Sequence, residues 1–508
     1  MHPGRALWSA KLHDRLQPRT HILLEPDAQY TPSLAPLLER RNSRYRHVAC
    51  SGFETSSYER IFDEGLLPEQ RRRPPGSSHQ DEVNPSLLFV ANLGHQSAKR
   101  TTSSSTSHAM IYRLMTAIRS HTLFHAYGLV RMLIWIADGE KRMILPRTVG
   151  DRRKYTVEAE FSLAQALEVA GVEGGAGSSR RERRLDLESA VNVSRSMRER
   201  GVTTPAHRKA QITREAEARL DAQDSGDVPD VKQPSGEGRD WQHELHELEA
   251  RFRRRDFTKF VASASRDQHK GVVREKTPAY ARLLALRTFA RAQRKNQDQV
   301  EQMLEEGAAL DRRRSSLEPH PTPEQREQLA TATRTLANQV ARLPEPVRAK
   351  MSLYRDDRQA FATRPPLLSW DRRRDEPLVV QPDEFSPAHA LTLLDLRPKA
   401  FPSTLQSPEA STSFEYLLSS LFLYPRRTLG ESLATLAPGA ADALLPQVTA
   451  QLQRRGETAE LTSVTVRSLS PVMIEALVGA WDAWPFRPSR VEMMTKMGVT
   501  PREGYRRT

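Results

Sequence analysis

The sequence predicts an α/β protein in which a parallel sheet is interrupted by a long helical or disordered insertion and followed by a C-terminal helical domain. Three observations lead to this prediction. Short apolar runs that end in turn residues alternate with helical spacing over residues 1–170. Residues 171–240 are rich in Arg, Glu, Asp, Ser and Gly and poor in large apolar side chains. Apolar runs return at residues 365–400, and amphipathic helices fill residues 401–508.

The composition indicates the kind of partner that the protein binds and excludes some kinds of site. The 508 residues include 77 Lys+Arg and 63 Asp+Glu, so the formal net charge is 77 − 63 = +14. This basic excess favours a polyanionic partner, nucleic acid before a membrane surface, although it is also typical of proteins in a basic organelle. The single cysteine, Cys50, excludes an intrachain disulfide and a Cys-rich zinc site. No apolar window is long enough to predict a membrane span.

The first segment contains the pattern of a parallel sheet. Residues 21–24 form an apolar run closed by Glu25-Pro26-Asp27, and residues 87–91 form a second run closed by Asn92. A third run at residues 129–136 ends in Ala-Asp-Gly, a turn signal. Helical spacing at residues 109–120 separates the second run from the third, and the order strand, helix, strand indicates parallel pairing.

The remaining chain divides by composition. We expect a disordered charged linker at 171–240 and a helical insertion at 241–364, with one helix starting at Thr322, which can cap its first turn. Residues 365–400 supply the last strands, at 378–380 and 391–396. The C-terminal domain contains predicted helices at 414–423 and 432–445.

Candidate ligand-binding residues lie at the ends of the predicted strands. Pro3-Gly4 forms a turn that leads into a helical segment at 7–16, as in nucleotide-binding loops, although no strand precedes it. Glu25 follows about twenty residues later, where a carboxylate can accept both ribose hydroxyls. Asn92 ends a further strand at the same edge of the sheet. Glu25 as an ordinary strand-end carboxylate and Asn92 as a turn residue remain alternatives.

These residues occur in the order of the motifs of the rRNA adenine N(6)-dimethyltransferase family, and other segments resemble its fungal mitochondrial members, which are related to the mitochondrial transcription initiation factor. The resemblance covers about 1–170 and 365–440. The matching segments are residues 7–14, 21–27, 90–93, 127–136, 144–147, 380–387, 391–396 and 421–429.

The resemblance implies a class I S-adenosylmethionine-dependent methyltransferase-like, Rossmann-like sheet. Gly4, Glu25, Ser51 and Asn92 then stand at the cofactor positions, and Asn92 is the catalytic candidate that would position the adenine amine. Arg426 and Arg427 lie where members of the family approach nucleic acid, so the resemblance implies that this pair would contact it.

The sequence also departs from the family's pattern. Ala6 replaces the second glycine of the cofactor loop, and Ser51 replaces the acidic residue that holds the adenine amino group. The catalytic Asn-Leu-Pro-Tyr motif is Asn92-Leu93-Gly94-His95, which weakens the expected site. The family register puts Met1 inside the first cofactor motif, so we expect a truncated start that lacks the first strand and the transit peptide.

Two functions therefore remain open. One is a mitochondrial transcription initiation factor that assists mitochondrial RNA polymerase in promoter recognition and melting in the matrix, without methyl transfer. The other is an S-adenosylmethionine-dependent rRNA adenine N(6)-methyltransferase of the mitochondrial small-subunit rRNA. The sequence predicts no metal site, because His243 and His246 do not have the i, i+4 spacing of a zinc-binding helix.

Overall fold

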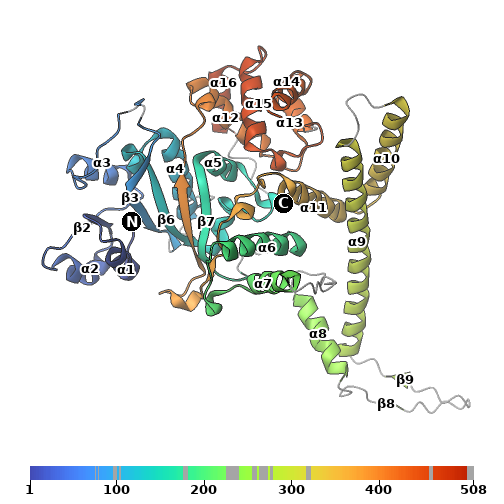
Figure 1. Cartoon of the computed structure of the whole chain (residues 1–508), viewed down its shortest axis with the longest axis horizontal. Helices are drawn as coiled ribbons and strands as arrows, with labels where there is room; N and C mark the ends of the chain where they lie inside the picture. The colour runs from blue at the N-terminus through green and yellow to red at the C-terminus, as the bar shows by residue number, and fades with distance from the viewer. Residues whose placement is uncertain are drawn as a thin grey trace, which may run out of the picture. The chain divides into compact units, whose positions relative to one another are not determined.

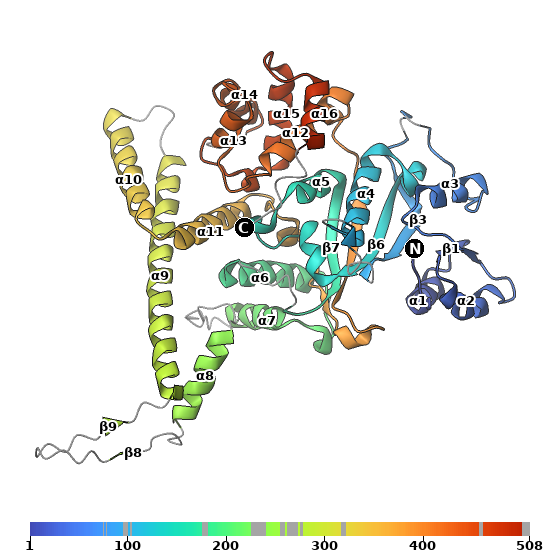
Figure 2. The same cartoon turned by 180° about the vertical axis from the view of Figure 1, so that it is seen from behind.

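The computed structural model describes residues 1–74, 76–77, 79–94, 100–101, 104–174, 181–224, 240–253, 260–261, 273–274, 278–315, 322–456 and 461–499. The chain divides into two compact units (Figures 1 and 2). The first comprises Met1–Arg181, Leu185–Val228 and Gln359–Thr508, and the second Glu182–Arg184 and Pro229–Arg358. Among the described residues, no helix is both long and apolar enough to cross a bilayer.

The first unit is built on a mixed five-stranded sheet in the order β10-β7-β11-β6-β3. Four of the strands point in one direction, whereas β11 is antiparallel to both of its neighbours, β6 and β7. The parallel pairing predicted for the runs at 87–91 and 129–136 is confirmed by β3 and β6, whereas the reversed direction of β11 was not predicted. The predicted runs at 87–91, 129–136, 378–380 and 391–396 are confirmed as strands, and β7 was not predicted. The bounds are β3 Val83–Asn92, β6 Leu129–Ala137, β7 Leu163–Gly171, β10 Leu378–Val379 and β11 Leu391–Pro398.

Alternation along β6 explains how the sheet buries its core. Met132, Ile134 and Ile136 point to one face, where they pack against α4 (Thr106–Ser120). Ser105 caps α4 by accepting a hydrogen bond from the His108 N–H. The other face of β6 carries Arg131, Leu133 and Trp135. This second face borders the candidate site described below.

An N-terminal layer lies beside β3 (Figure 2). It contains a two-stranded parallel sheet, β1-β2, whose strand β1 was predicted at residues 21–24. The backbone of Met1 and His2 bridges the two sheets: Met1 hydrogen-bonds Val90 and Asn92 of β3, and the His2 N–H donates to the Leu24 carbonyl. The bounds are α1 Leu7–Leu16, β1 His21–Leu24, α2 Thr31–Leu38, β2 Tyr45–Val48 and α3 Thr55–Asp63.

The segment at 171–240 corrects the prediction of a disordered linker. It contains α6 (Arg183–Glu199) and α7 (Gln211–Asp224), which pack through Ala190, Val191, Ala216 and Leu220. The buried faces use small side chains, and for that reason the composition did not indicate a core. Residues 175–180 and 225–239 of this segment lie outside the described part of the chain.

The second unit is helical. A capping box between Thr322 and Gln325 begins α10, as predicted. Helices α9 to α11 share an apolar cluster that includes Val300, Met303 and Tyr354. The bounds are α8 Asp240–Arg253, β8 Phe260–Val261, β9 Val273–Arg274, α9 Pro278–Ser315, α10 Pro323–Ala341 and α11 Glu345–Ala362, the end of which belongs to the first unit.

The C-terminal helices form a second core of the first unit around Phe414 and Trp481. The helix predicted at 414–423 is confirmed within α12. The helix predicted at 432–445 is wrong as a single element, because Pro438 and Gly439 (φ +75°) separate α13 from α14. The bounds are α5 Lys154–Ser162, which packs against this core, and α12 Pro408–Leu421, α13 Leu429–Leu436, α14 Ala440–Arg454, α15 Pro471–Ala483 and α16 Arg490–Val499.

Candidate functional site

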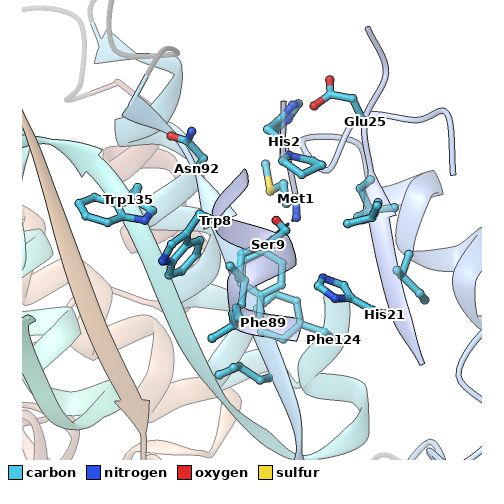
Figure 3. Close-up of a pocket in the computed structure, with 18 of the residues that line it drawn as sticks. Met1, His2, Trp8, Ser9, His21, Glu25, Phe89, Asn92, Phe124 and Trp135 are labelled. Carbon is cyan, nitrogen blue, oxygen red and sulfur yellow. Dashed lines mark hydrogen bonds between the residues drawn. The ribbon is translucent and has the colours of Figure 1, made fainter. Parts of the chain in front are cut away.

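Four predicted site residues line one cavity, which runs along β1 and β3 (Figure 3, where Glu25 and Asn92 are labelled). Gly4, Glu25, Ser51 and Asn92 all line this cavity, which has a volume of about 1640 Å³. They come from four separate segments, and the parallel direction of the strands brings their ends together. Arg426 and Arg427 do not line the cavity.

Glu25 is held by the backbone of its own loop. Its Oε2 accepts a hydrogen bond from the Gly4 N–H at 3.0 Å, and its Oε1 accepts one from the Asp27 N–H at 3.2 Å. The residue is only 4% exposed, and its carbonyl oxygen is bonded to His47 Nε2 at 3.0 Å. Because both carboxylate oxygens already have donors, Glu25 fixes the loop at residues 3–6 to the end of β1.

The predicted glycine loop adopts a left-handed backbone. Gly4 has φ +54°, which glycine accommodates without strain. Ala6, at the second glycine position of the family's pattern, has φ +56° and is 1% exposed. An alanine in this region is strained, by about 1–2 kcal/mol. The loop thus keeps the left-handed conformation of a glycine loop, and the methyl group of Ala6 packs with Leu23 and Leu34.

Ser51 and Gly52 close the cavity on the side of β2. The Ser51 Oγ accepts a hydrogen bond from the Phe53 N–H at 3.2 Å, and the Tyr58 hydroxyl donates to the Gly52 carbonyl at 2.8 Å. Burial raises the pKa of Tyr58, so the hydroxyl remains a donor at neutral pH. A Cβ on Gly52 would lie 2.5 Å from Met1 Cγ, which means that the Met1 side chain fills the space beside this glycine.

Asn92 ends β3, where the sequence places the catalytic motif. Its Oδ1 accepts a hydrogen bond from the Gly94 N–H at 3.2 Å, so the carboxamide closes its own turn. A Cβ on Gly94 would lie 2.4 Å from Cδ2 of Leu391, and Leu391 therefore occupies the space that a larger residue would need. His95 lies outside the described residues.

The cavity also has an aromatic wall that the sequence analysis did not assign to the site. Trp135 of β6 contacts Trp8 of α1 edge-on, with ring centroids 5.9 Å apart, and Phe385, with centroids 5.2 Å apart. Phe89 and Phe124 stack at 4.0 Å deeper in the cavity. A sequence signal existed, since Trp8 follows the Gly4 turn and Trp135 alternates with buried β6 residues. Such rings can stack on a planar ligand.

Arg426 and Arg427 lie in the turn between α12 and α13 and are exposed. The guanidinium carbon of Arg427 lies 4.1 Å from the ring centroid of Tyr424, which is itself 52% exposed. The Arg427 carbonyl accepts the Val466 N–H at 2.9 Å, so the backbone of the turn is held in place. The turn presents two cations and an aromatic ring on an ordered backbone, as phosphate and base contacts require.

A metal centre has no support among the described residues, where no group of three His, Cys, Asp or Glu side chains is arranged to hold an ion. Cys50 is a free, partly exposed thiol.

The fold and site therefore define an α/β protein whose mixed sheet carries a large cavity at the carboxyl ends of its strands. No protein-family model matches the chain. The chain is similar to mitochondrial transcription factor 1 of Saccharomyces cerevisiae, with 23% identity over 161 residues. The similarity covers 32% of this chain and 42% of the yeast protein, so it spans less than half the length of that relative.

Proposed function

We propose that this protein is a mitochondrial transcription initiation factor that uses a methyltransferase-like fold without methyl transfer. It would act with mitochondrial RNA polymerase on promoter DNA. The observation that carries the proposal is the similarity to a mitochondrial transcription factor over 161 residues. A methyltransferase-like fold can serve a function other than methyl transfer, because a fold does not determine the chemistry of its cavity.

The strand order supports the methyltransferase-like class. With Met1 and His2 between the two sheets, the order is β2, β1, Met1–His2, β3, β6, β11, β7 and β10. From the Met1–His2 segment the chain winds outward through β1 and β2 on one side and through β3, β6 and β7 on the other, as in doubly wound Rossmann-like folds, and β11 inserts antiparallel between β6 and β7. In such folds the ligand cleft lies where the strand order changes direction, and the four cavity residues lie there.

S-adenosylmethionine, the cofactor that this class implies, fits the residues poorly. Glu25 is the group that would accept the ribose hydroxyls, but it is only 4% exposed, and each of its oxygens already accepts one backbone N–H group. Ser51 offers a hydroxyl where active relatives have a carboxylate, and the Met1 side chain fills the space beside Gly52. We therefore expect the protein to act without this cofactor, and we assign no chemical step to it.

Nucleic-acid contact would then come from cations and exposed rings. Arg426 and Arg427 would neutralise phosphates, and Tyr424 would stack on an unpaired base of the melted promoter. Contacts of this kind stabilise a single-stranded region without reading its sequence.

The alternative function is a small-subunit rRNA adenine N(6)-methyltransferase. The position of Asn92 at the mouth of the cavity favours it, because an amide oxygen there could accept a hydrogen bond from a target amine. The Gly94 turn opposes it, since its N–H already occupies the Asn92 Oδ1.

Promoter-directed run-off transcription tests the proposal. The cognate mitochondrial RNA polymerase is assayed with and without the protein on duplex and pre-melted promoters, each with and without S-adenosylmethionine. We expect stimulation on the duplex, weaker stimulation on the pre-melted template and no effect of S-adenosylmethionine. No stimulation on the duplex would reject the factor role. Methyl transfer to the rRNA that Asn92→Ala abolishes would establish the alternative.

A further inference from the structure

Five exposed arginines gather at the end of the N-terminal layer that carries the amino ends of β1 and β2, away from Glu25 at the carboxyl end of β1. Arg15 and Arg19 flank the C-terminal end of α1, whereas Arg40, Arg41 and Arg44 lie in the turn between α2 and β2. The two segments, residues 13–19 and 39–44, also contain two acidic residues, Asp14 and Glu39, so their net charge is 5 − 2 = +3. We call these five arginines the amino-end basic surface.

Contacts between the segments show that they form one surface. Arg44 donates to the carbonyls of Gln17 and Pro18, both at 3.3 Å, and thereby ties the turn after α2 to the end of α1. Burial lowers the pKa of His13 on α1; Asp14 opposes this shift, and the positive charges of Arg44 and Arg40 add to it. The segments meet at the amino ends of β1 and β2, while Glu25 and Asn92 lie at the carboxyl ends of their strands (Figure 2).

No carboxylate of the described part of the chain neutralises most of this surface. Among the described residues, Arg15, Arg19, Arg40 and Arg41 have no carboxylate within 4 Å. Two exposed arginines elsewhere do have one: Arg60 pairs with Glu64 at 2.6 Å, and Arg198 pairs with Asp221 at 2.6 Å. Among the contacts of the described residues, Arg44 is the arginine of the five whose side chain has a structural role, because it donates hydrogen bonds to carbonyl groups at the end of α1.

We propose that the amino-end basic surface binds the phosphate backbone of double-stranded nucleic acid. The guanidinium group matches phosphate geometry by paired hydrogen bonds, and the surplus positive charge needs an anionic partner. Neither segment contains Phe, Tyr or Trp, so the surface lacks rings to stack on bases. The contact is therefore independent of base sequence and holds a duplex at a place distinct from Arg426 and Arg427.

This inference extends the proposed function by a second contact to DNA, but its test does not need transcription. The full chain is titrated with a fluorescent duplex of arbitrary sequence at several salt concentrations. The test variant combines Arg15→Gln, Arg19→Gln, Arg40→Gln and Arg41→Gln, and leaves Arg44 in place. The control variant replaces four exposed arginines that each have an acidic partner. Its substitutions are Arg60→Gln, Arg198→Gln, Arg374→Gln and Arg455→Gln.

Both variants lose four positive charges, so a general effect of net charge on the affinity for duplex DNA would be equal in the two variants. Each lost phosphate contact lowers the slope of log affinity against log salt by about 0.9, and we expect the test variant, which loses four contacts, to lose about 3.6 in slope. The control variant should keep the wild-type slope. Replacing the same four arginines by lysine should also keep the slope, since the charges remain, and this variant separates a charge effect from misfolding.

Equal slopes in the test and control variants would overturn the proposal. If the test variant binds duplex normally but loses transcription activity, the surface serves an acidic protein instead, which also overturns it. A wild-type protein that fails in run-off transcription but shows the arginine-dependent slope would refute the proposed function and leave this surface established.

Discussion

The backbone N–H of Gly4 donates to Oε2 of Glu25 at 3.0 Å, and this bond joins residues that are 21 positions apart in the sequence. With the Asp27 N–H on Oε1, it makes Glu25 a structural support of the glycine loop. The same position in an active methyltransferase-like site would bind a ligand. The two roles predict different consequences for one substitution.

Glu25→Gln should destabilise the protein. An amide offers one acceptor oxygen where the carboxylate has two, so its NH₂ would face a backbone donor, and the cost of such an unsatisfied contact is about 1–3 kcal/mol. Urea unfolding of the variant measures this loss. Glu39→Gln, at an exposed residue after α2, is the matched control and should change little. Wild-type stability in Glu25→Gln would show that the loop does not depend on this carboxylate.

Gly94 and Leu391 should behave as a coupled pair. A methyl group on Gly94 would lie 2.4 Å from Leu391 Cδ2, so Gly94→Ala overpacks a buried turn and should cost about 1–3 kcal/mol. Leu391→Ala removes the obstructing atoms. In a double-mutant cycle by thermal unfolding, Gly94→Ala should therefore cost clearly less in the Leu391→Ala background. Additive losses would contradict this account of why glycine stands in the motif.

The local elements could be predicted from the sequence where side-chain periodicity decides them. Leu129–Ala137 alternates sides and ends in a turn, and Thr322 and Gln325 form the expected capping box. The strand β2 (Tyr45–Val48) was not predicted, because its two central residues, Arg46 and His47, do not form an apolar run. The reversed direction of β11 leaves no local trace, since it depends on pairing with β6 and β7, which are distant in the sequence.

The position of the site could be predicted from the sequence, whereas the hydrogen-bond partners and the aromatic wall of the site could not. Gly4, Glu25, Ser51 and Asn92 converge because parallel strands end at one edge. The partners of Glu25 depend on the loop's left-handed turns at Gly4 and Ala6, which spacing alone does not determine. The aromatic wall of Trp8, Trp135 and Phe385 joins three distant segments, and no periodicity connects them.

The free energy of unfolding should fall on acidification because of a partly buried histidine, His21. His21 Nδ1 lies 3.1 Å from His13 Nδ1, and Tyr45 stacks on both rings. Burial lowers the pKa of His21 to about 4, and the neighbouring His13 and the N-terminal amino group add to the shift. The unfolded chain, with the ordinary pKa near 6.5, binds the proton more strongly than the folded chain, so stability decreases as pH falls from about 6.5 towards 4.

His21→Phe keeps a ring in the stack and removes the titration. Between pH 7 and pH 4.5 the wild type should lose about 2 kcal/mol more than this variant in urea unfolding. His79→Phe is the control, since His79 is exposed apart from its contact with Glu82. Equal pH dependence of wild type and His21→Phe would show that His21 does not cause the loss.

A buried ion pair between Arg152 and Glu160 should help to hold the C-terminal helices to the rest of the first unit. Arg152 is fully buried; it donates to Glu160 at 2.8 and 2.5 Å and to the Arg467 carbonyl at 2.9 Å. Glu160→Ala leaves this guanidinium without its counter-charge and should cost about 3–5 kcal/mol. Arg152→Met combined with Glu160→Leu should recover much of the loss. The exposed pair Arg60–Glu64 is the control, and breaking it should change the unfolding midpoint little.

The turn at Arg426 and Arg427 should contribute to nucleic-acid affinity through charge. Arg426→Ala with Arg427→Ala removes two exposed cations, so the slope of log affinity against log salt should decrease by about 1.4 on single-stranded DNA. Tyr424→Ala should weaken binding while leaving the slope unchanged, because stacking releases no counterions. The matched control is Arg454→Ala with Arg455→Ala, an adjacent exposed pair at the end of α14 in the same helical core. If both arginine pairs change the slope equally, the effect belongs to net charge and the turn is not a binding surface.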